Sequence, residues 1–69
     1  MVEIFKTNVE DAIHAEEIIG LLTQYFPAFH INFDLQDWDK ILRVKGESVP
    51  VDKIFAIVSQ KGFYCCVLN

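Results

Sequence analysis

The stretch that decides the fold is residues 8–22, which read NVEDAIHAEEIIGLL. It follows Val2–Thr7, a segment rich in β-branched and aromatic residues that is typical of a strand. Asn8 can cap a helix, and Asp11 three residues later completes a loose capping box. Apolar residues then recur at helical spacing, at Ala15, Ile18, Ile19 and Leu22. We therefore predict a strand over Val2–Thr7 and a helix over Val9–Tyr25, which Pro27 ends. Gly20 inside this helix costs about 1 kcal/mol relative to Ala, which a close approach to a neighbouring strand would explain, as would chance.

The next segment, Ala28–Leu35, alternates strictly between apolar and polar residues. One face would carry Phe29, Ile31, Phe33 and Leu35, and the other would carry His30, Asn32 and Asp34. This pattern predicts a strand with one covered and one wetter face. Residues 36–39 then form a hairpin loop, and Lys40–Lys45 returns as a third strand.

Helical spacing returns in Pro50–Lys61, with Val51, Ile54, Ile57 and Val58 on one side and Gly62 as the stop signal. Phe63–Leu68 is a last apolar strand. The order strand, helix, strand, strand, helix, strand predicts a single α+β domain over residues 1–69. It is the ferredoxin-like βαββαβ sandwich, with two helices on one face of a four-stranded antiparallel sheet. The predicted core contains Ile18, Ile19, Leu22, Phe29, Ile31, Phe33, Ile54 and Val58.

The composition bounds the partners. The chain has 69 residues, of which 52% are hydrophobic, and a formal net charge of −4. This charge argues against nucleic acid and against an anionic membrane surface, since both need a basic footprint. The sequence shows neither a signal-peptide pattern nor an apolar run near the roughly 20 residues of a membrane span. Cys65 and Cys66 are neighbours that would point to opposite faces of a strand, so we expect no disulfide, two buried free thiols and a reducing cytoplasmic setting.

These segments together resemble the heavy-metal-associated domain family, the fold of small copper chaperones and of metal-ATPase N-terminal modules. The resemblance covers nearly the whole chain: residues 8–14 fall on the family's Gly-Met-Thr-Cys-x-x-Cys loop, and Ile18–Leu22 falls on its helix. Phe33–Leu35 and Lys61–Phe63 match later segments of the family. Asp11 and His14 occupy the positions of the two metal-binding cysteines. The resemblance thus implies the copper-chaperone fold without its thiolate site, because a carboxylate and an imidazole bind soft Cu(I) poorly.

Two interpretations of this loop remain open. Asp11 and His14 could ligate a borderline ion such as Zn²⁺, Ni²⁺ or Cu²⁺, with Glu10 as a third ligand. Alternatively, Asp11 only stabilises the helix N-terminus and His14 is a surface residue. The last strand should begin at the end of the sheet where Asp11 lies. Cys65 should then be about two residues, roughly 7 Å, from that end, so its thiol would be near the loop but too far away to share a metal ion with Asp11.

Two further features suggest interaction rather than catalysis. His30, Asn32 and Asp34 should face solvent opposite Lys or Arg on the third strand, and this open sheet face could bind a protein partner or a second copy. Trp38 in the hairpin loop is either a partner contact or a lone exposed aromatic residue. The sequence contains no nucleophile–histidine spacing and no phosphate-binding glycine loop. We therefore predict a non-enzymatic interaction module without a cofactor, with a metal-binding protein built on Asp11 and His14 as the alternative.

Overall fold

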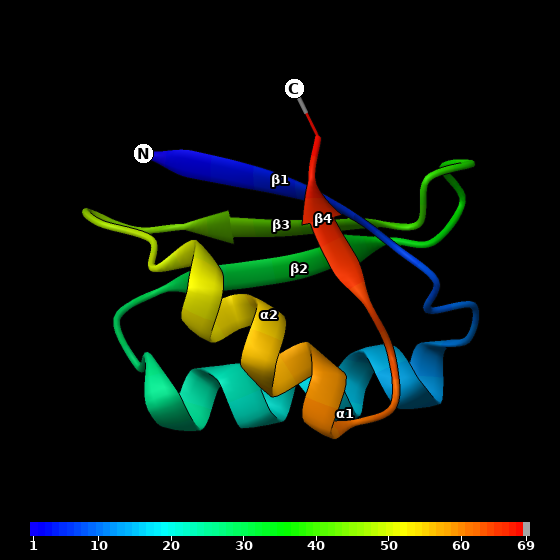
Figure 1. The fold of residues 1–69 in the computed structure, drawn as a ribbon, viewed down its shortest axis with the longest axis horizontal. Coiled ribbons are helices and arrows are strands. Elements are labelled where there is room, and N and C mark those ends of the chain that lie inside the picture. The colour runs from blue at the N-terminus through cyan, green and yellow to red at the C-terminus, as the bar shows by residue number, and fades with distance from the viewer. Residues whose placement is uncertain (69) are drawn as a thin grey trace.

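The computed structural model describes residues 1–68 and has the predicted order of elements. They are β1 (Val2–Thr7), α1 (Ala12–Tyr25), β2 (His30–Asp34), β3 (Ile41–Lys45), α2 (Val51–Gln60) and β4 (Cys65–Val67). The four strands form one antiparallel sheet in the order β2-β3-β1-β4 (Figure 1). The prediction of a ferredoxin-like βαββαβ fold is confirmed. Neither helix in residues 1–68 is long and apolar enough to span a membrane.

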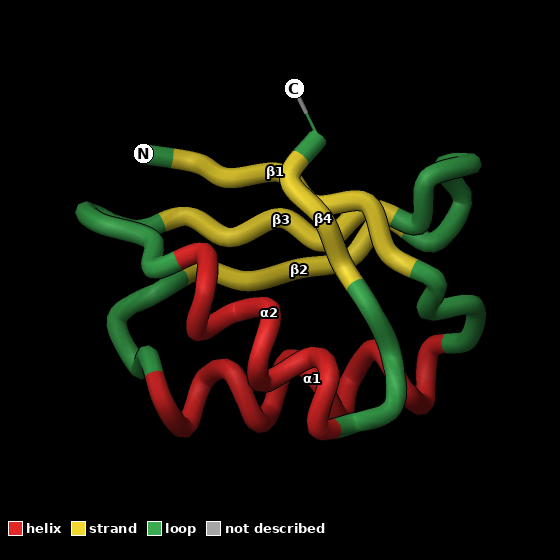
Figure 2. Tube along the Cα trace, viewed as in Figure 1, coloured by secondary structure: helices red, strands yellow, loops and turns green. Residues whose placement is uncertain are grey.

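The core lies between the sheet and the two helices, which Figure 2 shows on the same side of the strands. Its buried residues are Phe5, Val9, Ala15, Ile18, Leu22, Leu42, Val44, Ile54, Ile57 and Val58. Of the predicted core, Ile18, Leu22, Ile54 and Val58 are fully buried, and Phe29, Ile31 and Phe33 are partly buried against this cluster. Ile19 is only half-buried and does not belong to the cluster, so its prediction was wrong. It follows Ile18 by one residue, which turns it about 100° away from the buried side of the helix.

The first helix starts three residues later than predicted, at Ala12 instead of Val9. Val9 is instead a core residue of the preceding loop, and its backbone N–H donates to Thr7 Oγ1 at 3.1 Å. The residue that caps the helix is Asp11, whose backbone is extended. The predicted cap at Asn8 was wrong, because Asn8 Oδ1 accepts a hydrogen bond from the Tyr64 backbone N–H at 3.0 Å, across the fold.

Most other elements are shorter than predicted by one to two residues at an end. Before β2, the backbone N–H of Phe29 bonds to Phe26 O at 3.0 Å, so residues 26–29 form a turn. Lys40 before β3 has a positive φ of 48°, which a strand does not allow. After α2, the N–H groups of Gly62 and Phe63 bond back to the last turn of the helix, at Ser59 O and Val58 O, and this delays β4.

Gly20 and Gly46 differ in the space available for a side chain. Gly20 has no neighbouring atom within 4 Å of where a Cβ would lie, so a close approach to a strand does not explain it. Gly46, at the end of β3, is the position of close approach: a Cβ there would lie 2.4 Å from Cδ1 of Phe29. The bare backbone of Gly46 therefore makes room for the aromatic ring that precedes β2.

Candidate functional site

The structure brings the predicted Asp11 and His14 together at the N-terminus of α1. Asp11 Oδ1 accepts a hydrogen bond from the backbone N–H of His14 at 2.8 Å, and Asp11 Oδ2 lies 2.8 Å from His14 Nδ1. Both side chains are about half exposed to solvent. An ionised carboxylate can only accept, so Nδ1 is the donor in this pair, and Nε2 keeps its lone pair whenever the imidazole is neutral.

Both members of this pair are further constrained by their surroundings. The hydrogen bond from the His14 backbone N–H, and after it the bond from the His14 side chain, lower the pKa of Asp11 below its usual value. The imidazole of His14 also packs at a tilt against Phe63, with 5.1 Å between ring centroids. Asp11 is thus held as a charged helix cap, and it orients the imidazole of His14.

The rest of the loop does not add a ligand set. Glu10 is exposed, and within residues 1–68 no group of three or more His, Cys, Asp and Glu side chains is arranged to hold a metal ion. Asp11 and His14 are therefore an isolated pair among the described residues. Such a pair can contribute one or two ligands to a metal, and the remaining ligands would come from outside the chain or from water.

The two cysteines lie on opposite faces of β4, as predicted. Cys65 pairs with Thr7 on the helix side of the sheet and is half-buried, and burial raises its thiol pKa to about 11. Cys66 pairs with Lys6 on the outer face and is exposed, so the prediction that it is buried was wrong. The reason is that the helices cover only the other face of the sheet (Figure 2). Both thiols are free.

Thr7 is a structural residue of this region that the sequence reasoning did not single out. It is 4% exposed, its Oγ1 donates to the backbone carbonyl of Lys40 at 2.6 Å, and it accepts from the backbone N–H of Val9. It thereby joins the loop after β1 to the β2–β3 hairpin. A signal was present in the sequence, because Thr7 is a hydroxyl residue on the same side of the strand as Phe5.

The β2–β3 hairpin loop presents Trp38, which is 98% exposed. The loop around it is held by its own polar groups: Asp37 Oδ1 accepts from the Asp39 N–H at 2.9 Å, and Lys40 Nζ donates to Leu35 O at 2.9 Å. The backbone N–H of Thr7 also donates to Asp39 O. These bonds fix the loop while leaving the indole free, so Trp38 is presented on an ordered support.

The outer face of the sheet carries the predicted polar row of β2. His30 lies opposite Lys45 and Asn32 lies opposite Arg43 in the β2–β3 register. Arg43 Nη1 donates to Asn32 Oδ1 at 2.9 Å. The predicted placement of basic residues across the hairpin is therefore confirmed, and this face mixes cationic and polar groups.

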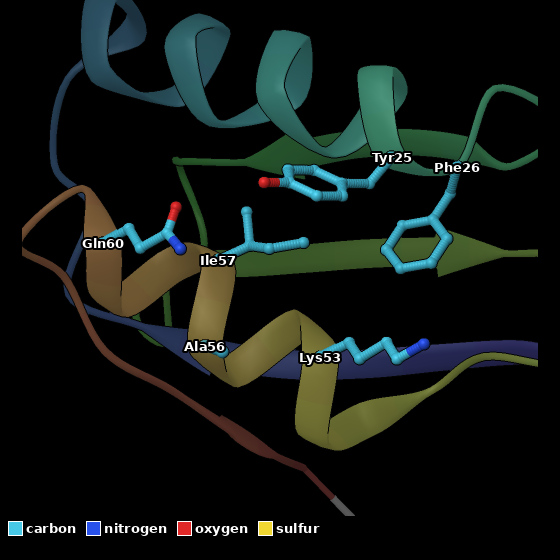
Figure 3. Close-up of a pocket in the computed structure, with 6 residues that line it drawn as sticks. All are labelled: Tyr25, Phe26, Lys53, Ala56, Ile57 and Gln60. Carbon is cyan, nitrogen blue, oxygen red and sulfur yellow. The ribbon is translucent and has the colours of Figure 1, made fainter.

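A shallow groove of about 310 Å³ separates the C-terminal end of α1 from α2 (Figure 3). It is lined by Tyr25, Phe26, Lys53, Ala56, Ile57 and Gln60. The sequence did not predict this groove, because its two walls come from helices far apart in the chain and neither carries a motif. It offers aromatic and aliphatic surface with one cation at Lys53, and its lining contains no Cys, His, Asp or Glu.

Together, the fold and the capped first loop define a ferredoxin-like domain with a hydrogen-bonded Asp–His pair after its first strand. A solved structure of the same architecture is the yeast copper transporter domain Ccc2a, determined in solution in the apo and Cu(I)-loaded states. It superposes with a TM-score of 0.81 at 18% sequence identity, over 99% of this chain and 94% of that one. At this identity the likeness shows the shared fold. No family model matches the sequence, and no curated protein is significantly similar to it.

Proposed function

We propose that this chain is a non-enzymatic protein-interaction module that has the fold of a copper transporter domain and lacks a thiolate Cu(I) site at its first loop. The observation that carries the proposal is the pairing of Asp11 with His14 where the resembling family has its two cysteines. The free thiols at Cys65 and Cys66 agree with a reducing, cytoplasmic setting.

The chemistry of the pair argues against copper at this loop. Cu(I) is a soft ion that prefers thiolate and thioether ligands, and Asp11 and His14 supply a hard oxygen and an imidazole nitrogen. Asp11 also caps the helix, since its side chain accepts a hydrogen bond from a backbone N–H at the N-terminus of α1 that has no partner within the helix. A metal bound through Asp11 Oδ1 would compete with that hydrogen bond, and one bound through Oδ2 would compete with the bond to His14 Nδ1.

The interaction part of the proposal is centred on Trp38. Trp is enriched among the residues that dominate binding energy at interfaces, and an ordered support lowers the entropy lost on binding. Trp38 is the only tryptophan in the chain and is 98% exposed. Its fluorescence therefore reports directly on partner binding: a partner that covers it shifts the emission to shorter wavelength, and Trp38→Ala weakens that complex. If a complex forms without a change in Trp38 emission, and the Trp38→Ala variant binds the partner as tightly as the wild type, Trp38 is not part of the interface.

The decisive experiment for the first loop is calorimetric titration of the protein with Cu(I), Zn²⁺ and Ni²⁺. We expect no tight Cu(I) binding at the loop. The variants are Asp11→Ala and His14→Ala, and His30→Ala is the matched control because His30 is the other histidine and is exposed on the sheet. Tight, stoichiometric Cu(I) binding that survives Cys65→Ser and Cys66→Ser would contradict the proposed loss of the copper site.

A second candidate function is binding of a borderline divalent ion, and the Asp11–His14 hydrogen bond specifically favours it. A histidine that gives its Nδ1–H to a carboxylate has its Nε2 oriented and made more basic, which is the usual arrangement around metal-bound histidines. Zn²⁺ or Ni²⁺ binding should then be weak, be lost in His14→Ala, persist in His30→Ala, and weaken as the pH falls and the imidazole is protonated. Equal binding by the two histidine variants would exclude this loop as the site.

A further inference from the structure

Strand β2 forms an open edge of the sheet. In the order β2-β3-β1-β4 it pairs only with β3, and among the described residues no backbone group of His30–Asp34 bonds to any other segment. Proline, lysine and β-bulges are features that commonly block the pairing of an edge strand with another chain. Strand β2 contains none of the three. His30 and Asn32 are exposed, and the other three residues are half-buried, so the edge is accessible.

The sequence of this strand, HINFD, is complementary to itself in the antiparallel direction. If two copies pair about a twofold axis at Asn32, His30 of one copy lies opposite Asp34 of the other, and this contact occurs twice. Ile31 of one copy lies opposite Phe33 of the other. Directly opposed residues share a face, so the His30–Asp34 pairs form on the outer side of the sheet and the apolar pairs on the helix side.

We propose that β2 is a homodimerisation edge, at which a second copy of this chain adds antiparallel to form one continuous sheet. The observation that identifies a second copy as the partner is complementarity of donor and acceptor: the strand has an imidazole, which donates through its ring N–H, at His30 and an acceptor carboxylate at Asp34, and these two residues exchange places under the twofold axis. This inference does not depend on the Trp38 contact or on the first loop, which lie outside the strand.

The neighbouring side chains agree with this pairing. Lys45 lies beside His30 on the adjacent strand, so the incoming Asp34 carboxylate would face His30 with the cationic Lys45 behind it. At the centre, Asn32 Oδ1 accepts from Arg43, which leaves the amide N–H groups of Asn32 available to the second copy. On the helix side, the half-buried Ile31 and Phe33 would cover each other's exposed parts.

A charge-swap series on the full chain tests the proposal, with the dimer dissociation constant measured by sedimentation equilibrium. His30→Glu and Asp34→Lys each turn both attractive pairs into repulsive or unfavourable ones, so each should weaken the dimer about tenfold or more. An equimolar mixture of the two variants should dimerise again. In that mixed dimer the introduced glutamate faces the introduced lysine, and the native Asp34 of one variant faces the native His30 of the other. The double variant His30→Glu/Asp34→Lys should dimerise as well, because both of its pairs are again between opposite charges.

Two controls separate this result from a general charge effect or a loss of folding. Glu16→Lys changes the charge by the same amount as Asp34→Lys on an exposed position of α1 and should leave the dissociation constant unchanged. Asp34 also accepts from the Gln36 N–H at 3.2 Å, so Asp34→Lys can disturb the hairpin. If it unfolds, the comparison of His30→Glu, which opposes Asp34 with a second carboxylate, with His30→Lys, which opposes Asp34 with a cation, decides.

Hydrogen exchange then locates the contact. Amides of residues 30–34 should gain protection as the wild-type concentration rises. A wild-type chain that stays monomeric at millimolar concentration would overturn the proposal. So would a dimer that is unaffected by His30→Glu, or one whose added protection lies outside β2.

Discussion

Replacement of Gly46 by alanine tests how tightly the end of β3 is packed against the start of β2. A Cβ at this position would lie 2.4 Å from Cδ1 and 2.5 Å from Cε1 of Phe29. Favourable carbon contacts begin near 3.5 Å, so the ring would have to move by about 1 Å. Phe29 is not free to do so, because it stacks on Phe26 with 4.9 Å between centroids and its backbone N–H bonds to Phe26 O.

The expected magnitude is the difference between two opposing effects. Inserting a methyl group into a filled space costs about 1–3 kcal/mol, and replacing glycine by alanine returns about 0.5–1 kcal/mol by restricting the unfolded chain. We expect Gly46→Ala to lower the free energy of unfolding by about 1–2 kcal/mol. For a domain of this size, that corresponds to a fall of Tm of about 5–15 °C.

Urea unfolding followed by circular dichroism measures this change, and a double-mutant cycle with Phe29→Ala assigns its cause. Once the ring is removed, Gly46→Ala should become neutral or stabilising by about 0.5 kcal/mol, which gives a coupling of about 2 kcal/mol. Gly20→Ala is the matched control: Gly20 lies inside α1 with no neighbouring atom within 4 Å of an added Cβ, so alanine should stabilise by about 1 kcal/mol. A Gly46→Ala variant as stable as wild type, or equally destabilised without the Phe29 ring, would refute the close-approach argument.

Three further outcomes follow from the region around the first loop. Thr7→Val should lower the free energy of unfolding by about 2 kcal/mol in urea titrations, because a buried N–H and a carbonyl lose their hydroxyl partner; an unchanged midpoint would contradict this. At pH 8 an alkylating reagent should label Cys66 and spare Cys65, whose burial raises its pKa to about 11, until urea exposes it; equal labelling in the native state would contradict this. The pKa of Asp11 is lower in the folded state than in the unfolded chain, where it is 3.8. The stabilisation by Asp11 is therefore complete above pH 3.8 and is lost as the pH falls from there through the lower pKa of the folded state. Asp11→Ala should remove this part of the acid dependence, and parallel pH–stability curves would show that Asp11 contributes none of it.

The order of elements could be predicted because each one has its own periodicity. The alternation of Phe29, Ile31 and Phe33 and the helical spacing of Ile54 and Val58 depend only on neighbours a few residues away. The ends of the elements depend on contacts between distant segments instead. Asn8 was predicted to cap the helix from its residue type, but its partner is Tyr64, which lies 56 residues further along the chain. No local pattern indicates that contact.

For the faces of the sheet, too, local pattern predicts one part and contacts between distant segments decide the other. Adjacent positions on a strand point to opposite sides, so Cys65 and Cys66 were correctly placed on different faces. Which face the helices cover could not be read from the apolar sequence of β4, and the exposed Cys66 was therefore predicted to be buried. The groove at Tyr25 and Lys53 likewise arises only when α1 and α2 meet.

The end of β1 and the loop after it are held in place by three polar residues, and these hydrogen bonds restrict how the loop could bind a metal. Thr7 binds the hairpin, Asn8 binds the chain before β4, and Asp11 binds the start of α1. A loop that captures a metal must turn its ligands toward the ion, and here each such turn would break a hydrogen bond that supports the fold. Without rearrangement, Nε2 of His14 offers a lone pair when the imidazole is neutral, and the Asp11 oxygens keep lone pairs that their two hydrogen bonds do not use. The geometry therefore limits any metal site at this loop to the Asp11–His14 pair, with the remaining ligands supplied from beyond the described residues or by water.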